Sequence, residues 1–104
     1  MIIYNITFHI ADEVLEDCIR FLQTDYIPFV LKDGIFTSPQ LCKVLAQSEE
    51  GSSYALQFQV DDVSLLNDWW KKNGEELSSL IVGRFSNKVM GFTTLLEPIN
   101  IHST

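Results

Sequence analysis

The chain has 104 residues, a length that suits a single domain. Its composition is 46% apolar, 12% aromatic and only 20% charged, which excludes a disordered chain because such chains lack the apolar groups to form a core. The formal net charge of −7 argues against nucleic acid and against anionic membrane surfaces, since both require a basic face.

The sequence has no basic segment followed by an apolar run, as in a signal peptide, and no apolar stretch near the roughly 20 residues that span a bilayer. Cys18 and Cys42 are its only cysteines, too few for a disulfide framework. We therefore expect a soluble cytoplasmic protein that has no membrane partner and keeps its thiols reduced.

The first ten residues predict a β-strand with two unlike faces. Apolar residues occupy every second position from Ile2 to Ile10, which is the period of a strand. The positions between them form a mostly polar second face that consists of Ile3, Asn5, Thr7 and His9. We expect this strand to be central in the sheet.

A helix is predicted to follow, with Asp12 as its cap and with acidic residues in its first turns. Pro28 lacks a backbone N–H and is expected to kink or restart the helix near Tyr26, and Gly34 is expected to end it. The apolar stripe of this helix recurs at steps of four and three residues, at Leu15, Ile19, Leu22, Tyr26 and Phe29.

Residues Phe36 to Gln47 and Tyr54 to Val60 predict a second and a third strand. The second strand is apolar on both faces, whereas the third alternates as the first strand does. The polar, glycine-containing segment 48–53 between them predicts a turn. We therefore expect these two strands to form a hairpin.

Either Asp61 or Asp62 is expected to cap a second helix. Asn73-Gly74 is expected to interrupt this helix, and Gly83 is expected to end its second part.

The remaining residues predict a loop and a last strand. Residues 84–87 form the predicted loop, and the fourth strand extends from Lys88 to Glu97, where Pro98 stops it.

The predicted order β-α-β-β-α-β is that of an α+β, ferredoxin-like fold, with a four-stranded antiparallel sheet and both helices on one face. Residues 1–98 would form this single domain and residues 99–104 a C-terminal tail. Two helices bury only one sheet face, so the other face requires a cover. We expect a homodimer through this face, in the form of a dimeric α+β barrel, with a face that includes Asn5, Thr7, His9, Gln57 and Gln59.

Framework residues along the chain resemble a known family. They are Met1-Ile2-Ile3-Tyr4-Asn5, Ile27-Pro28-Phe29-Val30-Leu31, Gly34, Phe36-Thr37, Phe85, Lys88 and Phe92-Thr93-Thr94-Leu95. The sequence is similar from Met1 to about Glu97 to a family of short bacterial proteins classed as a domain of unknown function. By topology alone it is also similar to the dimeric ferredoxin-like barrels, which include antibiotic-biosynthesis-type monooxygenases, haem-degrading enzymes and small sensing domains. The first family has no assigned activity that the resemblance could carry over to this chain. A shared fold alone does not determine function.

His9 is the best single candidate for a catalytic residue, since a histidine on the polar sheet face can act as an acid, a base or a ligand. The alternative interpretation, which we favour, is a hydrogen-bonded structural or interface histidine. His102 lies in the expected tail and should be solvated. Two histidines and two cysteines without motif spacing do not predict a metal site, and no cofactor is expected.

The pair Trp69-Trp70 is the other conspicuous feature. Adjacent helical residues point about 100° apart, so one indole can lie in the core and the other at the periphery. A half-exposed tryptophan can anchor a protein partner, although packing of both rings at the sheet edge is the simpler interpretation.

These observations favour a homodimeric binding or interaction module without intrinsic catalysis. The rival hypothesis is a small monooxygenase-like or haem-handling enzyme, with its reaction in the cavity between two sheets and His9 as acid–base group. A small-molecule ligand fits either reading, through neutral hydrogen bonds to Asn5, Thr7, Gln57 and Gln59.

Overall fold

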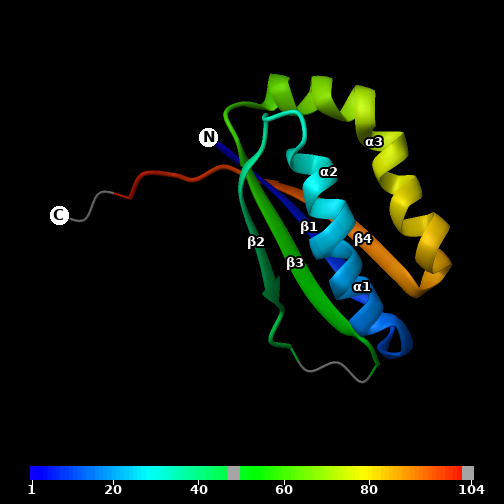
Figure 1. Ribbon diagram of the computed structural model, residues 1–104. Coiled ribbons are helices and arrows are strands. Elements are labelled where there is room, and N and C mark those ends of the chain that lie inside the picture. The colour runs from blue at the N-terminus through cyan, green and yellow to red at the C-terminus, as the bar shows by residue number, and fades with distance from the viewer. Residues whose placement is uncertain (47–49, 102–104) are drawn as a thin grey trace.

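The computed structural model describes residues 1–46 and 50–101 as one layer of strands and one layer of helices (Figure 1). Four strands form the sheet: β1 (Ile2–Ile10), β2 (Thr37–Lys43), β3 (Ser52–Val60) and β4 (Val89–Leu96). The first crossover contains a 3₁₀ turn (Asp12–Val14), α1 (Leu15–Phe21), a π-helical turn (Leu22–Tyr26) and α2 (Ile27–Leu31). The second contains α3 (Val63–Phe85) and a 3₁₀ turn (Ser86–Lys88).

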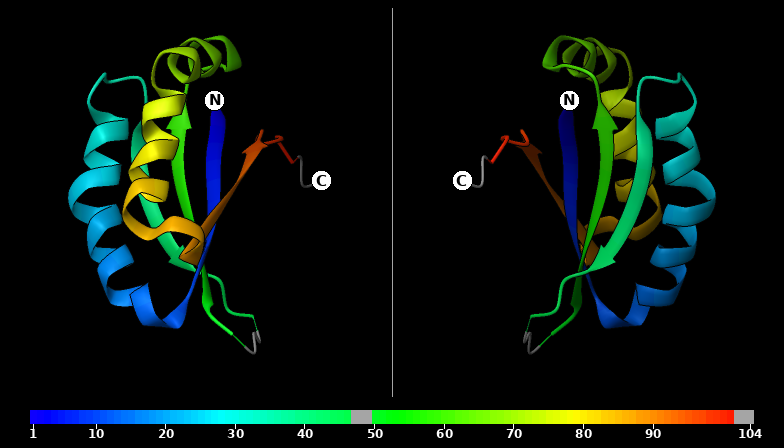
Figure 2. Two further views of the ribbon diagram at one scale, coloured as in Figure 1. Left: turned by 90° about the vertical axis from the view of Figure 1, so that its right-hand side faces the viewer. Right: turned by 90° about the vertical axis from the view of Figure 1, so that its left-hand side faces the viewer.

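The sheet is antiparallel throughout, in the order β2-β3-β1-β4. Both crossovers lie on the same side of it, as Figure 2 shows in two views. The predicted ferredoxin-like β-α-β-β-α-β fold is therefore confirmed. β1 pairs with β3 on one side and with β4 on the other, so it is the central strand that its sequence predicts.

The core lies between the sheet and the helices. Tyr4, Ile6 and Phe8 of β1 are buried there beside Leu56 and Phe58 of β3. The rings of Tyr4, Phe8 and Phe58 pack edge to face against Trp70, Tyr26 and Phe36, respectively, and such pairs stabilise beyond the area that they bury. Tyr54 pairs with Phe8 and so shares this face, but it is only half-buried.

The first crossover differs from its prediction in two ways. Asp12 does not cap a helix through its side chain, because it lies inside the 3₁₀ turn and the N-cap position of that turn is Ala11. After Tyr26 the fully buried residue is Val30, which the predicted stripe does not include, whereas Phe29 of the stripe is half-buried and packs against the core.

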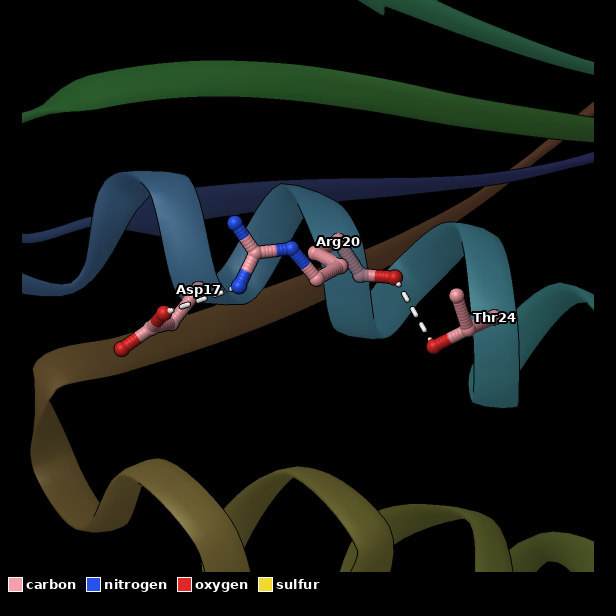
Figure 3. Close-up of polar contacts among 3 residues, drawn as sticks. All are labelled: Asp17, Arg20 and Thr24. Atoms are coloured by element: carbon pink, nitrogen blue, oxygen red, sulfur yellow. Dashed lines mark hydrogen bonds and ion pairs between the residues drawn. The ribbon is translucent and has the colours of Figure 1, made fainter.

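The helix passes Pro28 by widening into a π-helical turn just before it, where the N–H of Ile27 bonds to the carbonyl of Leu22. The Thr24 hydroxyl donates to the carbonyl of Arg20 over 3.0 Å, and Asp17 pairs with Arg20 over 3.6 Å (Figure 3). The helix is therefore disturbed near Tyr26, as the sequence predicts, and the disturbance takes the form of one wider helical turn. Gly34 follows the helix with a φ of 77°, as a terminating glycine requires.

The second helix is longer than predicted. Asp62 caps it, since its Oδ1 accepts the Leu65 N–H over 2.9 Å. The predicted interruption at Asn73-Gly74 and the predicted end at Gly83 are both wrong, because α3 continues to Phe85, whose ring is buried against Phe21. Tertiary packing of this last turn outweighs the weak helix propensity of the glycines.

The strand boundaries differ slightly from the prediction. β2 ends at Lys43 instead of Gln47, and β4 extends from Val89 to Leu96. A register shift in β2 after Thr37 accommodates Pro39, which cannot donate to the ladder. Gln47 and His102 lie outside the described residues. No described helix is long and apolar enough to cross a membrane.

Candidate functional site: an uncharged sheet face and a groove beside α3

The sheet face away from the helices is the first candidate site, and we call it the open face. Strand alternation and the registers place on it Ile3, Asn5, Thr7, His9, Thr37, Gln40, Cys42, Ser53, Ala55, Gln57, Gln59, Met90, Phe92, Thr94 and Leu96. All these residues are described, and none of them is Asp, Glu, Lys or Arg. In a chain with 21 such residues, the absence of charge from a whole sheet face is characteristic of an interface core.

The apolar part of the open face lies on the edge strand β4. Phe92 is 59% exposed and Met90 is 54% exposed, and Leu96 adds a third exposed apolar side chain. Phe92 lies opposite Thr7 and Met90 lies opposite His9, so this apolar stripe adjoins the polar positions of β1.

The polar part of the open face is hydrogen-bonded internally. The Gln57 amide donates to Asn5 Oδ1, and the Asn5 amide donates to Thr7 Oγ1, both over 3.2 Å. These bonds satisfy Asn5, which is buried despite its polarity. The face can therefore be covered by another surface at a low desolvation cost.

His9 lies at the end of the open face near the hairpin of β2 and β3. Its Nδ1 is 3.2 Å from the Ser53 hydroxyl, and its ring lies over Gly51, whose φ is 74°. A Cβ at Gly51 would lie 2.9 Å from His9 Nε2, so this close approach requires glycine. His9 also lines an open hollow together with Asp12 and Lys88.

The sequence prediction places Asn5, Thr7, His9, Gln57 and Gln59 on a common face. The registers bring these residues together on β1 and β3, although His9 lies at one end of them. Their proposed role in a ligand site or a dimer interface stays a prediction.

A groove beside α3 is the second candidate site, on the opposite side of the sheet. It consists of two adjoining hollows of about 300 and 280 Å³ that share Tyr4, Trp70 and Thr93. The floor is β1 and the walls are α3 and β4. The remaining lining side chains include Leu66, Asn67 and Leu95 at one end and Tyr26, Leu77, Ile81 and Gly91 at the other. An apolar lining with a few polar groups is typical of small-molecule sites.

The two tryptophans take different places around this groove. Trp69 is only 1% exposed and packs on Phe36 with 4.9 Å between ring centroids. Trp70 is 42% exposed and lines both hollows. Its indole lies over Gly74 one turn further along α3, because a Cβ there would be 2.7 Å from Trp70 Cε2. Only Trp70 of the pair therefore offers its ring to a partner or ligand.

Two tyrosines contribute polar groups to the groove. Burial raises the pKa of Tyr4 to about 12, and a hydrogen bond with the Thr93 side chain opposes this increase. Burial also raises the pKa of Tyr26, and the nearby Tyr4 adds to that increase. Both hydroxyls therefore stay protonated at neutral pH, when they can serve as neutral hydrogen-bonding groups.

The sequence reasoning missed this groove. Its depth comes from Gly91 and Thr93, the small residues that β4 presents opposite Phe8 and Ile6. The glycine at 91 and the threonine at 93 were visible in the sequence, but the face on which they lie depends on the register of β4.

In the described part of the chain, no three His, Cys, Asp or Glu side chains lie close enough together to hold a metal ion. Cys18 is buried, and burial raises the pKa of its thiol to about 11, which makes it a poor nucleophile or ligand.

The geometry defines an α+β protein of ferredoxin-like fold with one uncharged open face. Residues 1–99 match the family described as "Domain of unknown function (DUF4286)", and the chain belongs to this family. The family resemblance seen in the sequence is thus confirmed. No curated protein matches the chain.

Solved structures share the fold. A "putative antibiotic biosynthesis monooxygenase" from Deinococcus radiodurans aligns with a TM-score of 0.69 at 17% identity, over 99% of this chain and 100% of that chain. An ethyl tert-butyl ether d (ethd) family protein from Bacillus halodurans aligns with a TM-score of 0.68 at 10% identity, over 95% and 100%. A "dimeric ferredoxin-like protein" from an uncultured marine organism aligns with a TM-score of 0.54 at 12% identity, over 97% and 98%. These likenesses establish the fold alone.

Replacing Gly74 by Ala is expected to displace the Trp70 indole, since the new methyl group would overlap it. Acrylamide should then quench tryptophan emission more strongly than in the wild type. Gly83→Ala on the same helix is the matched control, because nothing lies within 4 Å of that position. It should leave the emission unchanged and stabilise the protein by roughly 0.5–1 kcal/mol. Equal stabilisation and unchanged quenching in both variants would contradict the packing of Trp70.

Alkaline pH is expected to destabilise the protein through Tyr4. Its pKa is about 12 when folded and roughly 10 in an unfolded chain, so between these values only the unfolded state releases the proton. Its contribution to stability is thus complete below about pH 10 and is lost as the pH rises toward 12. Tyr4→Phe should flatten this decline by about 2–3 kcal/mol in urea unfolding. Between pH 7 and 9 the difference between variant and wild type should stay constant, and a slope there would contradict the assignment.

Proposed function

We propose that the protein is a homodimeric binding module whose two copies pack through the open face. The observation that carries this proposal is the complete lack of Asp, Glu, Lys and Arg at the strand positions of that face, in a chain with a net charge of −7. Interface cores are depleted of charge in this way, and an uncharged surface lets two acidic copies meet without like-charge repulsion across the contact.

The size of the face supports this arrangement. Four strands about 4.8 Å apart, with roughly nine residues rising about 3.3 Å each, span roughly 20 by 30 Å. With its pleated side chains, such a face approaches the about 800 Å² per partner of a standard interface. One solved structure of this fold is also that of a protein described as dimeric.

The groove beside α3 supports the binding part of the proposal. Its apolar walls and the protonated hydroxyls of Tyr4 and Tyr26 suit a small, flat, largely apolar molecule that carries a hydrogen-bonding oxygen. Trp70, at the border of both hollows, would stack on such a ligand. The groove and the open face use opposite sides of β1 and β4, so a dimer would leave the groove accessible.

A small monooxygenase-like enzyme is the second candidate function. It draws on the exposed His9 beside Ser53 and on the fold shared with a putative antibiotic biosynthesis monooxygenase. In that case the reaction would take place between the two sheets, with His9 as acid–base group, and not in the groove beside α3, which His9 does not line.

Phe92→Asp is expected to convert the dimer into a monomer, because it places an unpaired carboxylate in the apolar stripe of the proposed interface. Light scattering during size-exclusion chromatography should give about 24 kDa for the wild type, twice the 11.9 kDa chain, and 11.9 kDa for the variant. Val82→Asp is the control, since Val82 is similarly exposed but belongs to the helix layer. A wild type that stays monomeric at high micromolar concentration would sink the proposal.

Oxygen uptake with a panel of hydroquinones separates the two candidate functions. A binding module should give no uptake above the rate without protein. Uptake that is present in the wild type and lost in His9→Gln, with the dimer intact, would establish the enzyme instead. If His9→Gln only weakens the dimer, His9 is an interface residue and not an acid–base group.

A further inference from the structure

The segment that follows β4 carries two exposed isoleucines and is separate from the helix layer. Ile99 is 81% exposed and Ile101 is 91% exposed, although isoleucine is among the residues most often buried. Pro98 precedes them and cannot continue the hydrogen-bond ladder of β4. Figure 1 shows this segment running away from the body of the chain.

This segment leaves the sheet on the side that faces away from the helices. In both views of Figure 2 the helices lie on one side of the sheet and residues 97–101 extend on the other. That side is the open face, where Leu96 exposes the last apolar side chain of β4. The segment is thus continuous with the proposed interface and leads outward from it.

We propose that residues 97–101 form an arm that packs on the second copy of the chain, with Ile99 and Ile101 as its anchors. This inference rests on the homodimer proposed above, and it adds a contact beyond the two sheet faces. Ile99 and Ile101 are two positions apart, so in an extended arm both side chains point the same way, toward one surface. Twofold symmetry makes the contact reciprocal, and each copy both gives and receives an arm.

The arm is less well placed to pack on its own chain than on a second copy. The apolar hollow closest along the chain is the end of the groove at Leu66 and Leu95, and it lies on the helix side of the sheet. Since the arm leaves β4 on the opposite side, it would have to reverse around the edge of β4 to reach that hollow. A second copy on the open face lies directly in the path of the arm.

The test is the double substitution Ile99→Ser/Ile101→Ser in the full chain, with the dimer dissociation constant measured by sedimentation over a range of concentrations. We expect it to rise about 100-fold or more, since four isoleucine side chains leave the interface of each dimer. Leu45→Ser is the matched control, because Leu45 is also 91% exposed but lies at the far end of β2. It should leave the dissociation constant unchanged.

A second measurement separates the arm from the proposed dimer itself. In the monomeric Phe92→Asp background, the double substitution should leave the urea midpoint unchanged, whereas an arm folded on its own chain would lower it. A dimeric wild type whose dissociation constant is the same with and without the two isoleucines overturns the arm alone. A wild type that is monomeric at every concentration overturns the homodimer, and the arm with it.

Discussion

The central strand β1 imposes the constraint on which the rest of the structure depends. It is hydrogen-bonded to β3 on one side and to β4 on the other, so the register of each neighbour is fixed by its match to β1. Its alternate side chains must satisfy two different environments. Tyr4, Ile6 and Phe8 anchor the core under the helices, whereas the positions between them leave a second face that no helix covers.

The distribution of charge follows from this division. The acidic residues of the described part of the chain lie in helices, turns and loops, and the open face has none. Solubility alone would not require an uncharged sheet face with exposed Phe92 and Met90, since charged side chains there would serve it better. The hydrogen bond between Asn5 and Gln57 further lowers the desolvation cost of covering this surface.

The sequence was sufficient for the fold because period-two alternation in β1 and β3 is strong and local. It was insufficient where a tertiary contact decides the outcome. Gly74 suggested a break in α3, but in the structure it is the place where the Trp70 indole lies against the helix. Likewise, β4 has apolar and polar residues on both faces, and only its register with β1 assigns Gly91 and Thr93 to the groove and Phe92 to the open face. The candidate site residues on β1 were predictable, whereas the groove depended on that assignment.

The two candidate sites share the same two strands. On β4, Thr93 lines the groove beside α3, while its neighbours Phe92 and Thr94 belong to the open face. On β1, Tyr4 forms the groove floor and Asn5 the polar centre of the open face. Because successive side chains of a strand move with one backbone, a displacement of β4 that widens the groove also moves the apolar stripe through which the copies are proposed to meet. The proposed ligand site on one side of the sheet and the proposed interface on the other are therefore linked through β4, which borders the groove and forms a free edge of the sheet.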